Sequence, residues 1–559
     1  DEFRFWEVAR SEAQIREAAI RPLDSLETGL IHLFPFNPRS DGLIIDQASG
    51  AMGNLSGGAQ YASVTSPVRD VVLQARDAGL YTLVLPPAPI TQGEYPVKAV
   101  LVNAGTDTLQ SVEVYWEVDE AAQTTVTEPL ALAPGQQDTL LLGNYTFSSS
   151  APNQVLASIT SSNGMEELNR SNDTVRQRVP VALQGEYIIG PSANAHYREL
   201  RFAVADLELV GVGGPTTFWV EPGEHEVNSL TIDSIPGASP ENRVTFASQN
   251  GDHNTTLFWS RSDYVLVLDG ANYLSLQNLG WQDRTNVHSQ ALQVTANTSG
   301  LVLQGNHFEG LHELGRLVST PPQVFEPSAV IEGNTFTKGF EGLYIVDPEG
   351  GSIPFLEIRD NRFIDQSDKG LLTQTVDSLI IHGNTVQSSQ SYNLMSGFYL
   401  LGMKHGAITN NQMEIMGRGR GLYLWNGEGT QEAPLIIANN VMVLRDALDA
   451  NAIYIQESVG VEIYHNSLYS NSLNLYGMNI LFIRCDSMTL KNNILYNHAG
   501  GRVLYNYQTP ILNSDHNVFF STATNYFAEH PVGSSVDDLD FDGWLSATGR
   551  DHNSLFIDP

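Results

Sequence analysis

One motif returns along the chain at an almost constant interval. It consists of an asparagine with a polar neighbour between hydrophobic residues, as in "IEGNTF", "IRDNRF" and "LKNNIL". The asparagines of the motif are Asn278, Asn306, Asn334, Asn361, Asn384, Asn411, Asn440, Asn466, Asn493 and Asn517. Successive positions are 23 to 29 residues apart. A motif that recurs ten times at this period indicates a solenoid of stacked units.

Each interval contains two or three short runs rich in β-branched residues and has no helical period. Coils of three strands and three turns therefore fit better than helical repeats or hexapeptide β-helices. We expect each Asn to lie at a tight corner, where its tolerance of left-handed backbone geometry suits it. The stacked amides should then hydrogen-bond to one another, and flanking apolar residues such as Ile331 and Phe336 should fill the interior. The motif is thus predicted to be architectural.

A different pattern precedes the repeats, from about Asp70 to Pro180. Short alternating runs are separated by turn sequences such as "NAGTDT" and "APGQQ", which predicts an antiparallel β-sandwich. The alternating residues expected to face its core are Val112, Val114, Trp116 and Val118. With "VKAVLVNAGTDTL" and "NRSNDT", this region resembles the immunoglobulin-like, cell-adhesion-related (CARDB-like) modules of secreted bacterial surface proteins. That resemblance implies a spacer or adhesive module.

Between the two patterns, "RELRFAVADLELVGVGG" has Leu200, Val204 and Leu207 at helical spacing, which predicts one capping helix. This helix and the repeats after it resemble right-handed parallel β-helices of bacterial secreted and cell-surface proteins. The predicted fold is therefore all-β, with a right-handed parallel β-helix preceded by an immunoglobulin-like β-sandwich. The expected domains are an N-terminal segment (1–68, the end of a preceding domain), the sandwich (69–182), the capped β-helix (183–521) and a C-terminal segment that leaves the β-helix (522–559).

Charge and composition limit the partners. The formal net charge of −34 argues against binding to nucleic acid or to an anionic membrane surface. No run of 18 apolar residues is present, so we expect no membrane insertion. The single cysteine, Cys485, lies between apolar residues, where a buried and unreactive side chain is expected. The style of the domains, together with abrupt chain ends, predicts an extracellular or cell-surface part of a longer polypeptide.

A candidate site emerges when residues are aligned by their distance from the repeated asparagines. Lys369, Arg420 and Asp449 fall in about the same row, and Arg418, Trp425 and Glu428 lie nearby. A uronate lyase or epimerase needs a base and a positive charge or Ca²⁺ to neutralise the sugar carboxylate. Lys369 or Arg420 would supply that group, Asp449 would orient it or bind Ca²⁺, and Trp425 would stack on a sugar. The alternative is that the row only solvates the β-helix.

The function that the sequence favours is structural or adhesive. Neither the "NTD…DD…GHG" pattern of polygalacturonases nor the "DPHD" of mannuronan epimerases is present, so the sequence leans against an enzyme. We expect a segment of a large secreted bacterial surface protein, such as a fibre, appendage or adhesin. The alternatives are a secreted polysaccharide lyase or epimerase and a non-catalytic glycan-binding module. Expected partners are other domains of the same polypeptide, identical subunits and surface glycans; no metal or cofactor is expected, except Ca²⁺ in the enzyme alternative.

Overall fold

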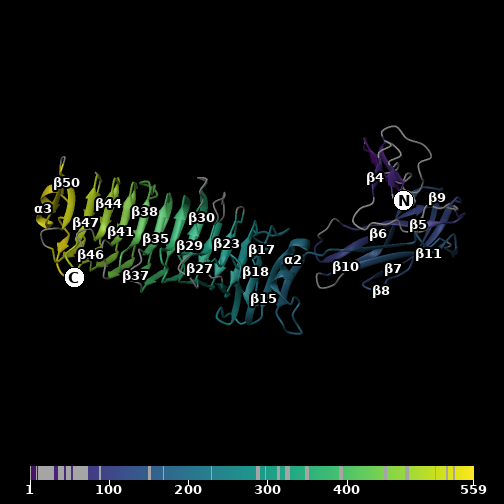
Figure 1. The fold of residues 1–559 in the computed structure, drawn as a ribbon, viewed down its shortest axis with the longest axis horizontal. Coiled ribbons are helices and arrows are strands. Elements are labelled where there is room, and N and C mark those ends of the chain that lie inside the picture. Colours follow the sequence, from purple (N-terminus) through teal and green to yellow (C-terminus); the bar gives the residue numbers. More distant parts are fainter. Residues whose placement is uncertain are drawn as a thin grey trace. The chain divides into compact units, whose positions relative to one another are not determined.

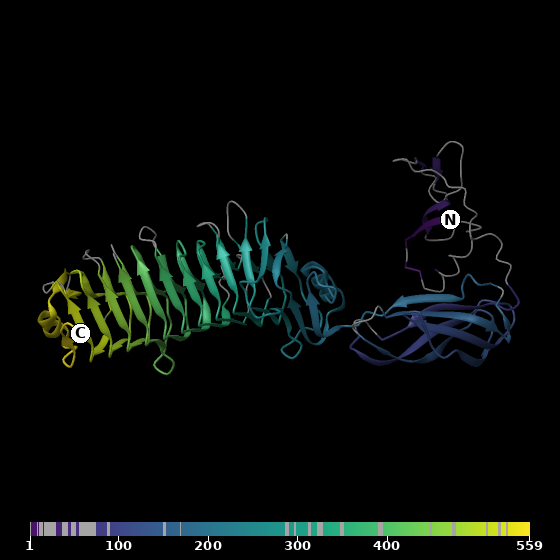
Figure 2. The ribbon, with the colours of Figure 1, turned by 90° about the horizontal axis from the view of Figure 1, so that it is seen from below.

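The structure is a computed structural model of the 559-residue chain. It describes residues 2–7, 9–10, 15, 30–35, 43–45, 52–54, 74–86, 90–148, 153–167, 169–227, 229–284, 290–295, 298–310, 315–320, 328–346, 352–389, 395–445, 450–471, 477–509, 512–523, 527–532 and 535–559. The chain forms two compact units (Figures 1 and 2). The first comprises Asp1–Leu85, Pro96–Asn144 and Gln154–Gln177, and the second comprises Pro86–Tyr95, Tyr145–Asn153 and Arg178–Pro559.

The sandwich region contains two antiparallel sheets. One is formed by β10 (Gln137–Phe147), β6 (Gly93–Asn103) and β5 (Ala78–Val84). The other contains β7 (Leu109–Val118), β8 (Ala121–Ala122), β9 (Val126–Leu132), β11 (Gln154–Ser162), β12 (Met165–Glu166) and β13 (Thr174–Arg178). Along β7 the predicted core residues Val112, Val114, Trp116 and Val118 are all buried, which confirms their expected direction. Two short hairpins precede the sandwich, β1 (Glu2–Trp6) with β2 (Leu30–Pro35) and β3 (Leu43–Ile45) with β4 (Met52–Asn54).

The second unit is a parallel β-helix with three sheets, each of 13 strands among the described residues. The first sheet contains β14 (Leu183–Ile189), β15 (Val212–Val220), β18 (Val244–Ser248), β21 (Leu274–Gln277), β24 (Leu301–Gln304), β27 (Ser328–Glu332), β30 (Ile353–Arg359), β33 (Val376–His382), β36 (His405–Thr409), β39 (Leu435–Ala438), β42 (Val461–Tyr464), β45 (Met488–Lys491) and β48 (Leu512–Asp515). The second contains β16 (Gly223–Glu226), β19 (Thr256–Ser260), β22 (Gly280–Asp283), β25 (His307–Gly310), β28 (Thr335–Thr337), β31 (Arg362–Ile364), β34 (Thr385–Ser388), β37 (Gln412–Met416), β40 (Val441–Arg445), β43 (Ser467–Ser470), β46 (Ile494–Asn497), β49 (Val518–Ser521) and β52 (Leu555–Phe556).

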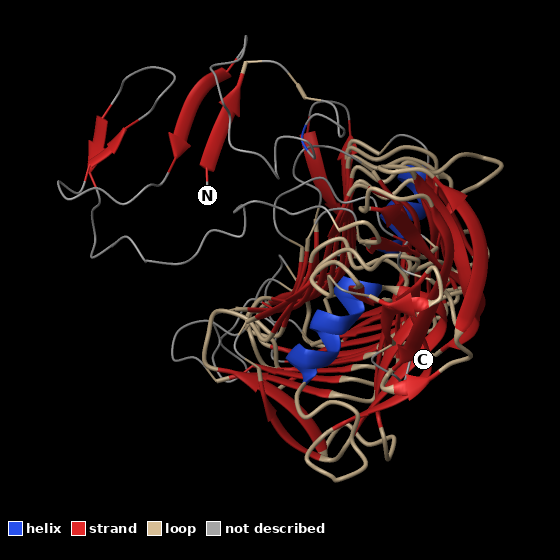
Figure 3. Ribbon diagram, turned by 90° about the vertical axis from the view of Figure 1, so that its right-hand side faces the viewer, coloured by secondary structure: helices blue, strands red, loops and turns tan. Residues whose placement is uncertain are grey.

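The third sheet contains β17 (Leu230–Ile232), β20 (Leu266–Leu268), β23 (Leu292–Val294), β26 (Arg316–Ser319), β29 (Glu341–Ile345), β32 (Lys369–Gln374), β35 (Met395–Leu401), β38 (Gly419–Trp425), β41 (Asn451–Gln456), β44 (Met478–Ile483), β47 (Arg502–Tyr507), β50 (Ala528–Val532) and β51 (Ser535–Leu539). Figure 3 looks along the stack, so that strands of successive coils overlap and the loops gather at the corners. The expected fold class, a parallel β-helix after an immunoglobulin-like sandwich, is confirmed.

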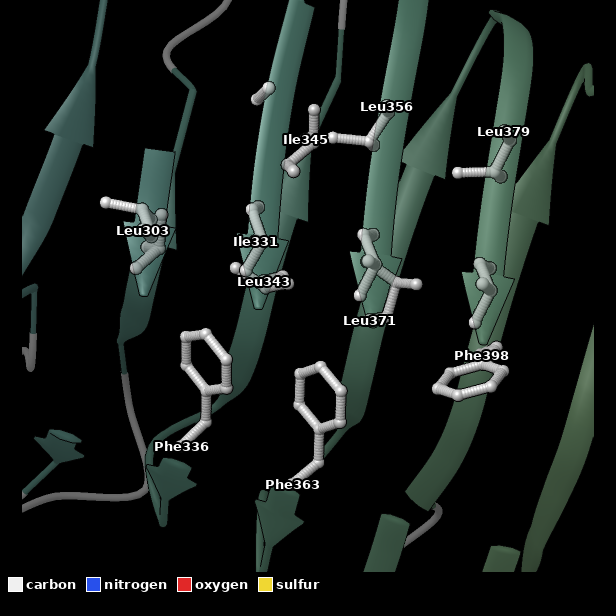
Figure 4. Packing of buried hydrophobic residues seen from close by; sticks show 14 of the residues in the cluster. Leu303, Ile331, Phe336, Leu343, Ile345, Leu356, Phe363, Leu371, Leu379 and Phe398 are labelled. Atoms are coloured by element: carbon white, nitrogen blue, oxygen red, sulfur yellow. The ribbon is translucent and has the colours of Figure 1, made fainter. Parts of the chain in front are cut away.

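The core of the β-helix is built from columns of like side chains. Phe308, Phe336 and Phe363 stack from coil to coil, with ring centroids 5.2 and 5.0 Å apart and nearly parallel planes. Figure 4 shows Phe336 and Phe363 side by side, with aliphatic side chains such as Leu303, Ile331 and Leu356 above them. Because parallel in-register coils place equivalent residues one above another, a repeated apolar position becomes a continuous interior column.

The repeated asparagines form a second interior column at the corner between the first and second sheets. Asn361 shows the pattern: its backbone N–H and its Nδ2 both donate to Oδ1 of Asn384 on the next coil, at 2.9 and 3.0 Å. The same Nδ2 also donates to the carbonyl of Ile331 on the preceding coil, at 2.8 Å. Corresponding side-chain bonds join the buried residues Asn306, Asn334, Asn361, Asn384, Asn411, Asn440, Asn466, Asn493 and Asn517. We call these nine residues the asparagine ladder.

Two expectations about this ladder are wrong. Asn278 is not part of it: the backbone N–H of Leu279 and Nε1 of Trp281 donate to Asn306, and Leu279 occupies the buried ladder position on that coil. The left-handed corner geometry also belongs to the residue before each ladder position. Positive φ angles are found at Asn278, Gly305, Gly333, Asp360, Gly383, Asn410, Asn439, His465, Asn492 and His516. The ladder residue itself turns its amide inward, where it is buried.

Both ends of the β-helix are covered by its own chain. The predicted helix is present as α2 (Leu200–Val210), and Leu200, Val204 and Leu207 are buried. The C-terminal segment does not leave the β-helix as expected: β50 pairs with β47, and β52 pairs with β49. After β51 the short helix α3 (Phe541–Thr548) buries Trp544 completely. An uncovered last coil would expose its core and the free edges of three sheets, which explains why this segment folds back.

Candidate functional site

The outer side of the third sheet carries the predicted site residues. Side chains alternate across each strand, so residues next to the buried core positions point outward. Three outward rows run in register across successive coils. The Lys369 row contains Arg316, Glu341, Lys369, Ser396, Arg420, Asn451, Met478 and Arg502. The tyrosine row contains Tyr344, Leu372, Tyr399, Tyr423, Tyr454, Leu481 and Tyr505, and the Trp425 row contains Gln374, Leu401, Trp425, Gln456, Ile483 and Tyr507.

Among the described residues, the charged side chains of the Lys369 row other than Arg420 are joined in ion pairs. The Glu341 side chain is only 3% exposed and accepts from Nε of Arg316 at 2.7 Å. Nζ of Lys369 lies 3.5 Å from the other Glu341 oxygen and also contacts Asp368. At the far end of the row, Arg502 donates to Asp538 of β51 at 2.7 Å. Desolvated charges are tolerated where an opposite charge is close, so the pairing accounts for the burial of Glu341.

Cations of the Lys369 row lie over rings of the tyrosine row. The Arg420 guanidinium is 5.0 Å from the Tyr423 ring centroid and 4.8 Å from that of Tyr454. The Lys369 ammonium is 5.2 Å from Tyr399. Each contact lies within the range of a cation–π attraction. Lys369, Arg420 and the rings of Tyr399, Tyr423 and Tyr454 thus form one strip, and the register of the sheet fixes their positions.

Two hydroxyl groups in the middle of the tyrosine row, those of Tyr423 and Tyr454, are hydrogen-bonded. Tyr423 and Tyr454 both donate to Oε1 of Gln456, at 3.2 and 3.1 Å. Burial, followed by the neighbouring tyrosines, raises the pKa of Tyr423 above its ordinary value, although Arg420 acts in the opposite direction. Burial also raises the pKa of Tyr454. Phenols with raised pKa values stay protonated near neutral pH, so they can bind hydroxyl groups but are not bases.

The structure brings some of the predicted residues together and separates others. Lys369 and Arg420 occupy equivalent positions in one row, with Ser396 of the intervening coil between them. Asp449 lies outside the described residues. The residue that pairs with Arg420 on the next coil is Asn451, two positions later than the count from the ladder predicts. The candidate acid is therefore not the register partner of Arg420.

The other three candidates lie at the two ends of β38. Arg418 is exposed in the turn before the strand. Trp425 ends the strand, is 37% exposed and donates from Nε1 to Glu457 at 2.9 Å. Glu428 lies in the following corner, where it is exposed and its backbone N–H donates to Met403. Trp425 is at the rim of the tyrosine row, whereas Arg418 and Glu428 do not face it as a group.

Sequence reasoning missed the tyrosine row itself. A signal was available in the strand sequences "GLYI", "GFYL", "GLYL", "AIYI" and "VLYN", each of which places Tyr directly after a core residue. Counting from the ladder hides this alignment because the loops that lead into the third sheet differ in length. Aligning the strands on their core residues reveals it.

Metal chemistry has little support on this face. Within the part of the chain that the structure describes, no group of three or more His, Cys, Asp or Glu side chains is placed to hold a metal ion. Cys485 is buried, and burial raises the pKa of its thiol. Its Sγ donates to the carbonyl of Ile455 at 3.3 Å, so it behaves as a core residue.

A shallow depression of about 440 Å³ lies on the outer side of the first sheet, near its beginning. Trp219 lines it, together with Glu186, Ile188, His196 and Gln249. Nδ1 of His196 accepts from the backbone N–H of Ile188 at 2.9 Å, which leaves Nε2 as the protonated nitrogen of the neutral ring. The depression therefore combines an indole surface with hydrogen-bond donors and acceptors.

One protein family matches part of the chain. Residues 248–444 match the family described as "Periplasmic copper-binding protein (NosD)". This segment lies within the β-helix and covers less than half of the chain. No curated protein matches the chain. None of the helices in the described residues is long and apolar enough to cross a membrane.

Several solved structures are similar to parts of the chain at low sequence identity. The α-1,3-glucanase of family GH87 from Streptomyces thermodiastaticus is 10% identical, with 78% of this chain and 94% of that chain covered and a TM-score of 0.36. The GH136 lacto-N-biosidase from Eubacterium ramulus is 9% identical, with 66% of each chain covered and a TM-score of 0.36. A CARDB domain from Pyrococcus furiosus is 19% identical over 20% of this chain and 98% of that one, with a TM-score of 0.18.

Proposed function

We propose that this chain is a non-cytoplasmic glycan-binding β-helix that holds a neutral polysaccharide along the tyrosine row. The observation that carries the proposal is the run of three tyrosine rings on consecutive coils of the third sheet, Tyr399, Tyr423 and Tyr454, flanked by hydrogen-bonding groups. Sugar rings present apolar C–H faces that stack on aromatic side chains and hydroxyl groups that bind amides and carboxylates. Coils about 4.8 Å apart suit a long, repetitive ligand better than a small molecule.

The charges on this face favour a neutral ligand. Cations at Arg316 and Lys369 are offset by Glu341 and Asp368, and Arg502 is offset by Asp538. The chain as a whole carries a formal charge of −34, which repels polyanions at long range. A neutral chain of hydroxyl-rich sugars avoids that repulsion, and it makes use of the protonated tyrosines and of Gln456.

Binding has more support than catalysis at Lys369. The Lys369 side chain is engaged in ion pairs with Glu341 and Asp368, so it is not free to act on a sugar as a base or as a carboxylate-binding group. The lyase or epimerase alternative would need another base. A structural or adhesive role in a surface or periplasmic protein is compatible with glycan binding, and the family match to a periplasmic group supports a location outside the cytoplasm.

The name of the matched family also suggests copper binding as a function. Copper sites in proteins are commonly built from His, Cys and Met side chains. Across the described residues no cluster of His, Cys and carboxylate groups fits such a site. We therefore base the proposed function on the tyrosine row.

The test is binding of the full chain to polysaccharides by affinity gel electrophoresis, with laminarin and dextran as neutral probes and alginate and polygalacturonate as anionic probes. We expect retardation by a neutral polysaccharide. A Tyr423→Ala/Tyr454→Ala variant should lose about 5- to 150-fold in affinity, since each lost ring contact is worth about 0.5 to 1.5 kcal/mol. Unchanged thermal unfolding of the variant would show that its fold is intact.

Tyr469→Ala is the matched control. Tyr469 stacks on Tyr496 on the outer side of the second sheet, with centroids 5.4 Å apart, so it removes a similar ring from a different face. An equal loss of binding in this control would contradict the proposal, and so would binding of the anionic probes alone.

A further inference from the structure

An oxygen-rich cluster lies inside the sandwich. Glu167 and Asp173 belong to the loop between β12 and β13, and each is only 3% exposed. Asp77, just before β5, is 4% exposed. Three carboxylates are thus buried within one small region of the sandwich.

Several of these oxygen atoms have no hydrogen-bond partner. Both Oε atoms of Glu167, Oδ1 of Asp173 and Oδ1 of Asn172 are buried without one. Asp77 differs, because its two oxygens accept from Nδ2 of Asn172 and Nδ2 of Asn169, each at 2.8 Å. The bond to Asp77 fixes which end of the Asn172 amide is used, so that the amide oxygen is the end that stays free.

Leaving these groups uncompensated is costly. A buried polar atom without a partner costs about 1 to 3 kcal/mol, and more when it is charged. Burial, then the charges of Glu167 and Asp77, raises the pKa of Asp173 to about 7. Arg170 counteracts this only weakly, since its own side chain is 70% exposed and paired with Glu166. A proton or a cation is needed to balance the site.

We propose that Glu167, Asp173 and the amide oxygen of Asn172 bind Ca²⁺, with Asp77 positioning Asn172. All the free atoms are oxygens, which are the ligands of hard cations, and no sulfur or imidazole is among them. Two carboxylates with amide oxygens and water make an ordinary calcium set of six to eight ligands. Among the described residues no group of three His, Cys, Asp or Glu side chains is placed to hold a metal ion. The proposed site instead uses two carboxylates and one amide.

Such a site would stiffen the module outside the cell. Calcium sites in extracellular modules typically have dissociation constants of about 10⁻⁴ to 10⁻³ M. Bound Ca²⁺ would tie the β12–β13 loop to β5, because Asn172 donates from its side chain to Asp77 and its carbonyl accepts from the backbone N–H of Leu80. The fold of the sandwich would then depend on the calcium concentration of its surroundings.

The experiment is isothermal titration of the full chain with CaCl₂ after removal of metal by EDTA, together with thermal unfolding with and without 10 mM CaCl₂. We expect one site per chain and a rise of several °C in the lower unfolding transition, with little response to MgCl₂. Glu167→Gln should abolish the heat of binding and the calcium-dependent rise. It should itself remain folded, because it removes a buried charge.

Glu166→Gln is the matched control, since Glu166 is the neighbouring acid but is 73% exposed. It should retain the full calcium response. A wild-type chain that shows no heat of binding and no thermal shift with CaCl₂ would overturn the proposal, as would a calcium response that survives in Glu167→Gln. A titration that depends on pH but not on calcium would assign the balancing charge to a proton instead.

Discussion

The asparagine ladder and the Glu167 cluster bury polar side chains in opposite ways. In the ladder, each amide oxygen accepts two bonds from the preceding coil, as Oδ1 of Asn384 does from Asn361. In the cluster, four buried oxygens lack partners. The ladder is neutral, and the asparagine of each next coil accepts the hydrogen bonds of the one before it. The cluster is charged and is not repeated, and among the described residues no group donates a hydrogen bond to its four free oxygens.

This difference teaches how to separate structure from function among buried polar groups. A satisfied neutral network contributes to stability and needs no ligand. A buried charge without a partner is stable only if something outside the chain balances it. The following substitutions test this comparison, beginning with the largest expected effect.

Removing an internal ladder residue should be the most damaging change. Asn384→Ala would leave the backbone N–H and Nδ2 of Asn361 without their acceptor and open a small cavity. With about 1 to 3 kcal/mol for each orphaned donor, we expect the free energy of unfolding of the β-helix to fall by about 2 to 5 kcal/mol. Chemical denaturation followed by circular dichroism measures it. Gln387→Ala, an exposed position three residues later, is the control and should change little.

The end of the ladder should be less sensitive. Ser554 accepts from the backbone N–H of Asn517 at 2.8 Å and donates to Asp551 at 2.7 Å. Ser554→Ala removes one acceptor, while Nδ2 of Asn517 keeps its bond to the carbonyl of Leu490. We expect a loss of about 1 to 2 kcal/mol in the same denaturation experiment. A loss as large as that of Asn384→Ala would contradict the expectation that the loss follows the number of hydrogen bonds removed.

The cluster should respond with the opposite sign. Asp173→Asn keeps the shape of the side chain and removes one of the buried charges, so in EDTA we expect the lower unfolding transition to rise by about 1 to 4 °C. With calcium present the variant should be less stable than the wild type, because a ligand is lost. Differential scanning calorimetry under both conditions gives the comparison. Destabilisation of the metal-free variant would show that Asp173 has a structural role, as the ladder residues do.

Much of the fold followed from spacing alone. The positions from Asn306 to Asn517 were visible as a repeated motif, and the core alternation of β7 was visible in "SVEVYWEVD". The misassignment of Asn278 has a local cause: the motif "LQNLGW" resembles the others, but its asparagine lies one position earlier, at the left-handed corner. Sequence could not show this, because Asn suits both the corner and the ladder.

The outer face was harder to predict. Counting aligned Lys369 and Arg420 correctly because they lie eight and nine residues after Asn361 and Asn411. Asn451 lies eleven residues after Asn440, so it takes the place in which Asp449 was expected. Distances along the chain therefore locate an outward residue only when the preceding loops match. The strand register, which depends on backbone hydrogen bonding, sets the true alignment.

By itself the sequence determined the architecture, because a period of 23 to 29 residues and alternating strands admit few ways to bury their apolar side chains. Only the tertiary structure decided where the chemistry lies. The tyrosine row joins strands on different coils, and the Glu167 cluster joins Asp77 to a loop about 90 residues later. Repeated packing is visible in the sequence as a regular spacing of similar residues. A site depends instead on which distant side chains the backbone brings within a few ångströms and on whether water can still reach them.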